Sequence, residues 1–570
     1  MPRVIDSVVD TIIDAGIDYV FGLPGGVSGF ILEEFYKRSD QINTIIARHE
    51  NSASIMADMY GRMTRKPGIL LGQGPFIATN GGLGIIEAFH AGVPMVILTE
   101  TSDYHGNSLQ ACYQSGTGEY GTVDIRNIFK SMTKYTAYPT EPEEVPYAVQ
   151  LAIKHATSGR PGPACVFTRW NVWTNVIDDL SSLEVPIYPI EGHLRVTPPC
   201  ISDLDAQKIA NLLIAADNPV MICGRGVHAS AAYDEVLQLA EMIGMPVATS
   251  YMGKGSIPEV HDLALGVMAS FGQQLADDMI KNADVILAVG TCLAPDNTNN
   301  CSPEFIDVKW QKIIHIDIEP RNAGWTYPVT IGVTSDAKLA LQKIIHAISS
   351  KMEYFKVDVN QRISDLLELK KIEEKEFFTS KKYDSEETPV QPESVVRVLN
   401  ELTDEDDLLV LDAGNNRMWF TRLFKTQYAG QIYGAGGVAA MGWGPNASLI
   451  AQMLNKDKKV ISIAGDGSFA MMIYVLQTAK QYDLPISYMI FNDGHLGNIR
   501  DVLSRKGRDL SIIPGLNFAE IAKGMGVEGV RVENYDELYP KLEESLKSDH
   551  TTLTDILIDQ KASHLRIRRS

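Results

Sequence analysis

Apolar runs that end in glycine recur three times along the chain, each at the start of a similar unit. In every unit a helical pattern of apolar and polar positions follows the glycines, and a short apolar run opened by a proline comes next. The glycine ends lie at 21–26, 222–226 and 464–467, and the proline-opened runs begin at 93–94, 245–246 and 484–485. Strands that alternate with helices in this way pair in parallel with right-handed crossovers. The pattern therefore predicts an α/β protein with three doubly wound parallel-sheet domains.

Two stretches of different composition separate the three units. Residues 186–199 are rich in proline, and residues 351–392 are charged, with a helical pattern in their middle and a polar loop near their end. Such segments are typical of linkers between domains. We therefore expect domains at 1–185, 195–350 and 390–560.

Charge and cysteine content narrow the class of protein. The 570 residues include 51 Lys and Arg against 71 Asp and Glu, a net charge of −20, which argues against general binding to nucleic acid or to an anionic membrane. We interpret the short basic stretch at 561–570 as a solvated tail. The six cysteines form no C-x-x-C pair, which suits a reducing cytoplasm. The first 22 residues read as an amphipathic helix and a strand rather than a signal peptide, and no apolar run is long enough to cross a membrane, so a soluble cytoplasmic protein is expected.

Acidic residues follow two of the predicted strands in the last unit. The apolar run 458–464 leads into Gly465-Asp466-Gly467-Ser468, and the run 485–491 leads into Asn492-Asp493. Because the carboxyl ends of parallel strands meet at one edge of a sheet, both carboxylates should lie together there. The glycines let a phosphate approach the backbone, and the free amides of a helix predicted at 469–482, capped by Ser468, form an anion site. Oxygen ligands of this kind suit Mg²⁺ shared with a phosphate.

The spacing of these two segments resembles the diphosphate-binding fingerprint of thiamine diphosphate (ThDP) enzymes. The second metal ligand of that fingerprint falls on Asp493, an aspartate where the family has an asparagine. An alternative stays open, in which Asp493-Gly494 is an ordinary turn and Asn492 is the ligand. The resemblance implies that Asp466, Asp493 and the His495 carbonyl bind Mg²⁺, and that Gly467, Ser468, Leu496 and Gly497 contact the cofactor.

Other motifs resemble the large catalytic subunit of acetolactate synthase (acetohydroxyacid synthase) across nearly the whole chain. In the first domain they are Arg48-His49-Glu50 after the run 43–47, the loop Gly25 to Ser28, and Gly74-Pro75 with Thr79-Asn80. In the third domain they are Gly414-Asn415-Asn416 and the stretch 436–444, which contains Ala439 and Met441. The resemblance implies the pyrimidine, middle and diphosphate domains of a ThDP enzyme.

The resemblance also assigns roles to these residues. Glu50 would hydrogen-bond the pyrimidine ring of ThDP, and Met441 would support the folded cofactor from below. The remaining contacts with ThDP would come from Pro75, Asn80, Gly414, Asn415, Asn416 and Ala439. Gly26, Val27 and Gln110 would lie beside the substrate. Taken alone, Glu50 could simply open a helix, Met441 could be a core residue, and the glycines at 25–26 could close a turn.

The reaction implied is that of a ThDP- and Mg²⁺-dependent 2-keto acid decarboxylase and carboligase. The ylid of the cofactor attacks a 2-keto acid such as pyruvate, carbon dioxide leaves, and the resulting enamine adds to the carbonyl of an acceptor, a 2-keto acid or an aldehyde. In the family the glutamate of one subunit serves the diphosphate domain of another. The resemblance therefore implies a homodimer or homotetramer with active sites at the subunit interface.

The chain departs from acetolactate synthases where the substrate is bound. Gln110 is retained but its neighbours differ, residues 113–121 look like an insertion, and Val502 stands where a tryptophan is expected. A carbon–carbon lyase of the benzaldehyde lyase or 2-hydroxyacyl-CoA lyase type therefore stays open as an alternative. The Gly224-Arg225-Gly226 turn resembles a segment that contacts FAD, but a lone G-x-G is a weak signal, so FAD or ADP in the middle domain stays an open question.

Two further classes fit the sequence less well. A nucleotide-binding dehydrogenase needs a G-x-G-x-x-G turn with an acidic residue some way beyond it, and the chain offers only Gly224-Arg225-Gly226 without a good acidic partner. A non-catalytic scaffold of the same fold would not need both Glu50 and Asp466. An enzyme is therefore expected.

Overall fold

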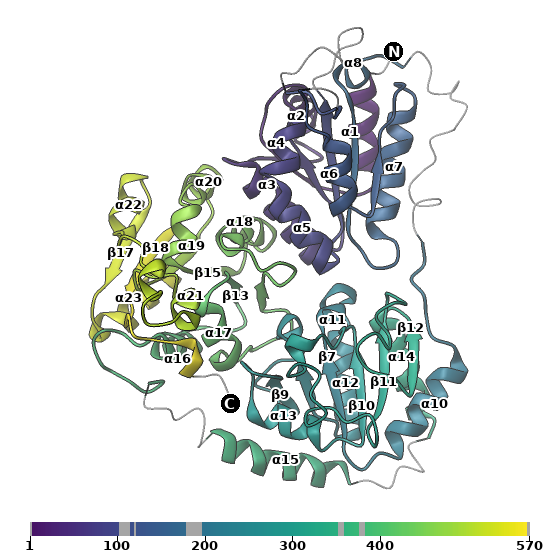
Figure 1. The fold of residues 1–570 in the computed structure, drawn as a ribbon, viewed down its shortest axis with the longest axis vertical. Coiled ribbons are helices and arrows are strands. Elements are labelled where there is room, and N and C mark those ends of the chain that lie inside the picture. Colours follow the sequence, from purple (N-terminus) through teal and green to yellow (C-terminus); the bar gives the residue numbers. More distant parts are fainter. Residues whose placement is uncertain are drawn as a thin grey trace. The chain divides into compact units, whose positions relative to one another are not determined.

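Three parallel sheets organise the protein in its computed structural model (Figure 1). The structure describes residues 3–101, 114–118, 121–177, 196–351, 358–374 and 382–566. Within these ranges each sheet has six strands, and the strands pair in parallel. Helices alternate with the strands along the chain. The predicted fold class of three doubly wound parallel-sheet domains is confirmed, whereas the bounds 1–185, 195–350 and 390–560 stay a prediction.

The first sheet has the strand order β2-β1-β3-β4-β6-β5. Its strands are β1 (Tyr19–Gly22), β2 (Asn43–Ile46), β3 (Gly68–Leu71), β4 (Met95–Thr101), β5 (Tyr135–Ala137) and β6 (Pro163–Arg169). Its helices are α1 (Val4–Asp14), α2 (Ser28–Tyr36), α3 (Glu50–Thr64), α4 (Gly74–Thr79), α5 (Gly82–Ala91), α6 (Ile125–Met132), α7 (Glu144–Thr157) and α8 (Trp170–Trp173). All residues of the inner strand β4 are buried, because a parallel sheet is covered on both faces, whereas the edge strand β2 is buried at one position.

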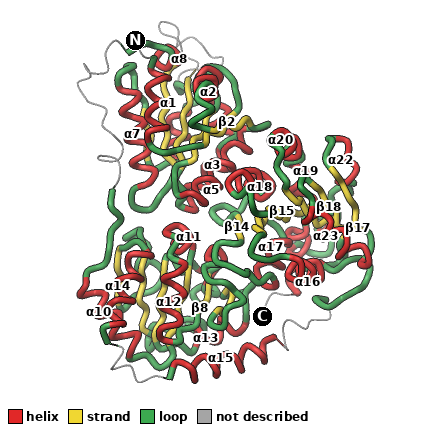
Figure 2. Tube along the Cα trace, turned by 180° about the vertical axis from the view of Figure 1, so that it is seen from behind, coloured by secondary structure: helices red, strands yellow, loops and turns green. Residues whose placement is uncertain are grey.

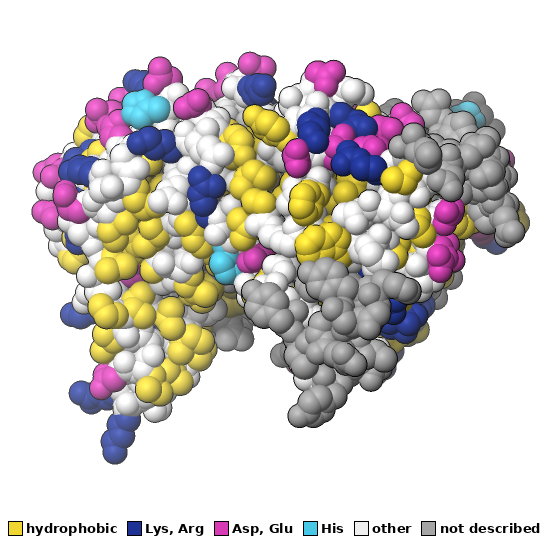
Figure 3. Space-filling model, turned by 90° about the horizontal axis from the view of Figure 1, so that it is seen from above, with side chains coloured by type: hydrophobic (Ala, Val, Ile, Leu, Met, Phe, Trp, Pro, Cys, Tyr) yellow, Lys and Arg dark blue, Asp and Glu magenta, His cyan; other side chains and the backbone are white. Residues whose placement is uncertain are grey.

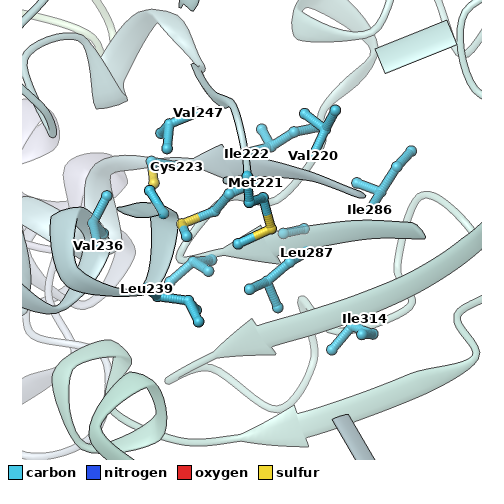
Figure 4. Packing of buried hydrophobic residues seen from close by; sticks show 14 of the residues in the cluster. Val220, Met221, Ile222, Cys223, Val236, Leu239, Val247, Ile286, Leu287 and Ile314 are labelled. Carbon is cyan, nitrogen blue, oxygen red and sulfur yellow. The ribbon is translucent and has the colours of Figure 1, made fainter. Parts of the chain in front are cut away.

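The middle sheet follows a different order, β12-β11-β10-β7-β8-β9. Its strands are β7 (Pro219–Cys223), β8 (Val247–Thr249), β9 (Ala264–Val267), β10 (Val285–Val289), β11 (Lys312–Asp317) and β12 (Ile331–Thr334). Its helices are α10 (Asp203–Ile214), α11 (Arg225–Ser230), α12 (Tyr233–Ile243), α13 (Gln274–Lys281) and α14 (Ala337–Ser349), and α15 (Val359–Glu373) follows. Figure 2 shows α12 and α14 in red beside the yellow strands of this sheet. Figure 4 shows Val236 and Leu239 of α12 beside the side chains of β7, in a core whose members are fully or almost fully buried.

The third sheet has the order β14-β13-β15-β16-β18-β17, which repeats the order of the first. Its strands are β13 (Asp407–Leu411), β14 (Ile432–Gly434), β15 (Lys459–Gly465), β16 (Ile486–Asn492), β17 (Glu528–Val532) and β18 (Thr552–Leu557). Its helices are α16 (Pro392–Leu402), α17 (Asn415–Leu423), α18 (Trp443–Leu454), α19 (Asp466–Met471), α20 (Val475–Gln481), α21 (Gly497–Val502), α22 (Phe518–Gly524) and α23 (Leu538–Lys547). The three units share a strand, a glycine turn and a helix, but only the first and third share a sheet order.

The chain packs into two compact units that do not follow chain order. The first contains the N-terminal sheet together with residues 435–454 and 474–482, and the second contains the middle sheet and the rest of the C-terminal part. In the first unit α18 packs on α3. The loop that precedes α18 therefore belongs to the same unit as the N-terminal sheet.

The surface carries both signs of charge. On the described part of the face in Figure 3, Lys and Arg side chains lie among Asp and Glu side chains rather than in one basic patch. The described part of this face is therefore of mixed charge. Across the described ranges, no helix combines the length and hydrophobicity that crossing a bilayer requires.

Candidate functional site

Polar residues gather at the carboxyl ends of three adjacent strands of the third sheet. β13, β15 and β16 lie side by side, and Gly465 at the end of β15 is in register with Phe491 of β16. Asp466 therefore follows one strand, and Asp493 follows its neighbour. Both carboxylates are buried, with 4% and 7% of their surface exposed. The carboxyl edge of the sheet thus brings together the two residues that the sequence predicts as metal ligands.

Asp466 is held by backbone amides. Its two carboxylate oxygens accept hydrogen bonds of 2.7 Å from the N–H groups of Gly467 and Gly494. Burial raises the pKa of Asp466 to about 6, and the neighbouring Asp493 carboxylate adds to the rise. Two buried carboxylates that disfavour each other's charge are stabilised by a cation between them.

Asp493 has a cationic partner of its own. Its carboxylate lies 3.0 Å from a guanidinium nitrogen of Arg500, and both side chains are buried. Burial raises the pKa of Asp493, and the Arg500 charge opposes the rise. Because Arg500 offsets its negative charge, Asp493 adds less net negative charge to the site than the sequence suggests.

The side chain of the neighbouring Asn492 makes hydrogen bonds to other parts of the third domain. Its side-chain amide donates to Asp555, at 2.8 Å, and to the carbonyl of Leu516, at 3.0 Å. These bonds tie β16 to its neighbour β18 and to the loop before α22. This arrangement favours Asp493 over Asn492 as the residue that faces Asp466.

The helix expected at 469–482 differs from the structure. The helix begins at Asp466, ends at Met471, and a second helix runs over Val475–Gln481. Ser468 therefore lies inside the first turn rather than at the cap, and its hydroxyl donates to the carboxylate of Asp412. The prediction of a Ser468 cap was wrong because the helix begins earlier than expected, at Asp466, so that Gly465 takes the cap position and Ser468 lies within the helix.

The turn after β13 supports the same edge. Gly414 has φ +114°, a conformation that a side chain would strain, and it precedes α17. Asn416 donates to the carbonyl of Asp412, at 3.1 Å. Asn415 donates to Asp501 of α21, at 3.1 Å, and a Cβ on Gly497 would lie 2.7 Å from the Asn415 amide.

His495 and Leu496 lie in the loop that follows β16. The imidazole Nδ1 of His495 lies 2.8 Å from the carbonyl of Asp493, and the Leu496 N–H donates to Ser511. Across the described residues, no three His, Cys, Asp or Glu side chains are placed to bind one metal ion. Two carboxylates, a carbonyl and a phosphate are a different donor set, and the oxygen donors present fit Mg²⁺.

Glu50, the glutamate predicted to activate the cofactor, lies in the compact unit that contains the N-terminal sheet. Glu50 is the first residue of α3, as the simpler interpretation also held, and it is half-buried. Its carboxylate accepts a hydrogen bond of 3.1 Å from the side chain of Asn80, at the end of α4. Pro75 lies in the first turn of α4. Glu50 and Asn80, which the sequence singled out from two separate motifs, are thus in contact.

The loop before α18 is anchored by a residue that sequence reasoning missed. Both carboxylate oxygens of Glu87 accept backbone hydrogen bonds from four consecutive residues, at 2.9, 2.7, 2.7 and 3.1 Å, given by Gly436, Gly437, Val438 and Ala439. Ala439 has φ +56°, the left-handed conformation that a non-glycine residue rarely adopts. Met441 follows in the same loop and is half-buried. Glu87 therefore sets the shape of the segment expected beneath the cofactor.

A buried charge network surrounds Glu87. The guanidinium of Arg62 lies 2.7 Å from Glu87 and 2.9 Å from Asp58, and the indole N–H of Trp443 donates to Asp58 at 2.8 Å. Burial alone would raise the pKa of Glu87, but the Arg62 charge and the loop amides outweigh it and hold the pKa at about 2. Glu87 stands in the otherwise apolar stretch GLGIIEAFHA, and that isolated charge was the signal available in the sequence.

The loop predicted beside the substrate contains another strained position. Gly26 has φ +54°, and a Cβ there would lie 2.5 Å from a carboxyl oxygen of Glu100. Val27, the next residue, is fully buried and precedes α2. Gln110 lies outside the described residues, as does part of the expected insertion at 113–121. Val502, at the end of α21, is 68% exposed.

The glycines of the middle domain have a packing explanation. A Cβ on Gly224 would lie 2.3 Å from the carbonyl oxygen of Gly290, and one on Gly226 would lie 2.5 Å from the Cα of Gly290. The turns after β7 and β10 therefore pack backbone to backbone. FAD or ADP in this domain stays a prediction.

Comparison with known proteins agrees with this geometry. Three family models match the chain in order: the thiamine pyrophosphate enzyme N-terminal TPP binding domain over residues 2–122, the central domain over 206–344 and the C-terminal TPP binding domain over 412–556. Each match contains one of the three sheets or most of it.

Relatives of similar length cover nearly the whole chain. The probable acetolactate synthase large subunit of Methanocaldococcus jannaschii is 30% identical over 97% of this chain and 91% of its own length. Acetolactate synthase isozyme 3 large subunit of Escherichia coli is 28% identical over 97% and 94%, and the chloroplastic acetolactate synthase of Arabidopsis thaliana is 28% identical over 97% and 81%. The chain therefore belongs to the thiamine pyrophosphate enzyme family and is a ThDP-dependent enzyme similar to acetolactate synthase large subunits.

Proposed function

We propose that the protein is a ThDP- and Mg²⁺-dependent decarboxylase and carboligase that acts on a 2-keto acid such as pyruvate. The observation that carries the proposal is the pair of buried carboxylates, Asp466 and Asp493, at the ends of adjacent strands, because a diphosphate-bound Mg²⁺ is the ligand that such a pair suits best. The similarity to acetolactate synthases supports the 2-keto acid as the substrate class.

The clamp, by which we mean the polar residues at the carboxyl edge of the third sheet, would hold the diphosphate end of the cofactor. Asp466, Asp493 and the His495 carbonyl would bind the metal. The amides at the start of α19, with Gly467 and Ser468, and the turn at Leu496 and Gly497 would face the phosphates. The turn from Gly414 to Asn416 would complete this side.

In the family the glutamate of one subunit serves the diphosphate domain of another, so residues of the N-terminal sheet would hold the ring end of a cofactor bound by the partner subunit. Glu50 would hydrogen-bond the pyrimidine, with Asn80 and Pro75 beside it, and Asn80 already orients the Glu50 carboxylate. Met441 and Ala439 would support the cofactor from the loop that Glu87 anchors. ThDP supplies a carbanion that adds to carbonyl carbon and an electron sink for the decarboxylation.

We expect the finer properties to follow the family. These are a homodimer or homotetramer with active sites at the subunit interface, a cytoplasmic location, and domains at 1–185, 195–350 and 390–560. Sedimentation of the purified protein would test the oligomeric state, and a flavin absorption spectrum would test for FAD in the middle domain.

The acceptor substrate is the property in which this protein is most expected to differ from acetolactate synthases. Val502, which stands where the relatives' pattern predicts a tryptophan, is 68% exposed, so it does not fill the space that an indole would take. Cleavage of an acyloin or a 2-hydroxyacyl-CoA without loss of carbon dioxide would point to a carbon–carbon lyase instead.

One experiment tests the proposal. The protein with ThDP and Mg²⁺ is incubated with a panel of 2-keto acids, aldehydes and acyloins, and the products are identified by mass spectrometry. Glu50→Gln should lose about 10²- to 10⁴-fold in turnover, because an amide cannot exchange the proton. Glu33→Gln, on the exposed face of α2, is the matched control and should keep full activity. Full activity of Glu50→Gln would contradict the mechanism.

A further inference from the structure

A carboxyl group outside the expected machinery lies buried at the end of a central strand. Glu100 is the penultimate residue of β4 and is 1% exposed. Neither of its carboxyl oxygens has a hydrogen-bond partner among the described residues. Burial raises the pKa of Glu100 to about 8, and the Val27 backbone N–H, too poorly placed for a hydrogen bond, offsets only part of the rise. Near neutral pH the side chain is therefore an uncharged acid.

The described groups that face this acid are neutral. Gly26 touches it, since a Cβ there would come within 2.5 Å of Oε1 and within 3.3 Å of the side-chain nitrogen of Gln73. Gln73 donates to the side chain of Gln114 at 2.6 Å. Among the described residues, no charged side chain on the elements packed against Glu100 contributes to its pKa. The acid thus belongs to a small polar cluster against the loop of Gly25, Gly26 and Val27.

The described residues leave the hydrogen-bonding capacity of this carboxyl group unused. A buried donor or acceptor without a partner costs about 1 to 3 kcal/mol, and nearly all such groups in native proteins are satisfied. Here a carboxyl group whose two oxygens are satisfied by none of the described residues sits against a backbone turn whose left-handed glycine leaves it room. Costs of this kind are retained where a ligand completes the site.

We propose that Glu100, in its protonated form, is a substrate-binding residue that donates a hydrogen bond to the carbonyl oxygen of a 2-keto acid or aldehyde held against the loop from Gly25 to Val27. The inference rests on the proposed function, which places the substrate beside this loop. The uncharged acid also avoids repelling a carboxylate-bearing substrate, which an ionised glutamate would do. Glu100 therefore links substrate binding to the protonation of one buried group.

The test has a spectroscopic part that needs no turnover. Infrared difference spectra of the holoenzyme between pH 6.5 and 9.5 should show the C=O stretch of a protonated carboxyl group that disappears with a midpoint near pH 8. Glu100→Gln should remove this band. Asp407→Asn, at a second buried carboxyl far from the loop in sequence and with a pKa of about 6, should leave it. Addition of pyruvate or benzaldehyde should shift the band.

The kinetic part uses pyruvate and follows KM against pH. For the wild type, KM should rise as the pH passes 8, because the donor is lost and a negative charge appears. For Glu100→Gln, KM should be independent of pH in this range, because the amide N–H donates throughout. Glu100→Ala should raise KM by about 3- to 10-fold at pH 7 with a smaller change in kcat.

The outcomes separate this inference from the proposed function. A band that pyruvate and benzaldehyde both leave unshifted overturns the inference, and so do parallel pH profiles of KM for the wild type and Glu100→Gln. Absence of ThDP-dependent turnover, with a band that still shifts on adding either compound, overturns the proposed function alone. If Glu100→Ala fails to fold, the comparison of the wild type with Glu100→Gln decides the matter.

Discussion

Glu87 and Glu100 are two buried glutamates of the same compact unit with opposite properties. Glu87 accepts four backbone hydrogen bonds and pairs with Arg62, and its pKa is held at about 2. Glu100 has no hydrogen-bond partner among the described residues, and its pKa is raised to about 8. Both side chains are almost fully buried. Burial alone therefore does not decide the charge of a carboxyl group, because the partners supplied by the fold decide it.

The difference in charge between Glu87 and Glu100 corresponds to a difference in their roles. The charged Glu87 is satisfied within the protein and organises the loop that contains Met441. The uncharged Glu100 accepts no hydrogen bond from the described residues and lies against the loop where the substrate is expected. A carboxylate whose hydrogen bonds are all made within the protein stabilises the structure. A carboxyl group whose hydrogen bonds are not made within the protein is available to bind a ligand.

Removal of Glu87 should have the largest effect. Glu87→Ala leaves four amides and the buried Arg62 without their carboxylate, so the free energy of unfolding should fall by about 3 to 5 kcal/mol. Urea denaturation of the variant and the wild type measures the difference. Glu33→Gln, on an exposed position of α2, is the control and should change the free energy of unfolding by less than about 0.5 kcal/mol. A loss from Glu87→Ala as small as that of the control would contradict the anchoring role.

Glu100 should make the protein less stable as the pH rises. A carboxyl group with a folded-state pKa of about 8, above its ordinary 4.5, costs no stability below pH 4.5 and a growing amount up to pH 8. The slope for one group is about 1.4 kcal/mol per pH unit, which integrates to at most about 4 to 5 kcal/mol. Glu100→Gln should lack this component, which urea denaturation between pH 5 and 9 measures. Equal slopes for variant and wild type would show that Glu100 is hydrated or paired.

Glu87 should act with the opposite sign and at lower pH. Its folded-state pKa of about 2 lies below the ordinary 4.5, so its contribution to stability is complete above pH 4.5 and is lost as the pH falls toward 2. The loss should amount to about 3 kcal/mol. Acid denaturation followed by circular dichroism should be steeper for the wild type than for Glu87→Gln. A steeper acid transition for Glu87→Gln than for the wild type would contradict the conclusion that Glu87 is charged in the folded protein.

The two proposed metal ligands, Asp466 and Asp493, should show a smaller difference of the same kind. Asp493 pairs with Arg500, whereas Asp466 accepts backbone hydrogen bonds and has no ion pair among the described residues. A metal ion should therefore be the main charge partner of Asp466. Asp466→Asn should weaken Mg²⁺-dependent retention of ThDP by about 10- to 100-fold more than Asp493→Asn does. Retention is measured by titrating Mg²⁺ into chelated protein, and equal losses would contradict the unequal roles.

Much of the clamp could be predicted from the sequence because its signals are local. Apolar runs ending in Gly465 and Asn492 predict strands, and neighbouring parallel strands place Asp466 and Asp493 at one edge. One helix was predicted at 469–482, whereas the structure has two, which end at Met471 and begin again at Val475. The order of the middle sheet also differs from the order of its neighbours, although the glycine turns look alike.

The charged groups inside the first unit could not be predicted in the same way. Glu87 and Gly436 are 349 positions apart, so no window of sequence contains both partners. Glu100 precedes no motif, and its surroundings come from the turn at Gly26 and from Gln73 on other elements. Only an isolated charge within an apolar stretch marked either residue.

The sequence by itself determined the fold class, the family and the residues expected at the cofactor, because strand periodicity, glycine turns and motif spacing are properties of short segments. The tertiary structure alone decided which carboxylates carry charge and what each one contacts. Desolvation, hydrogen bonds and ion pairs depend on residues that the chain brings together from distant positions, and these interactions set the protonation of Glu87 and Glu100.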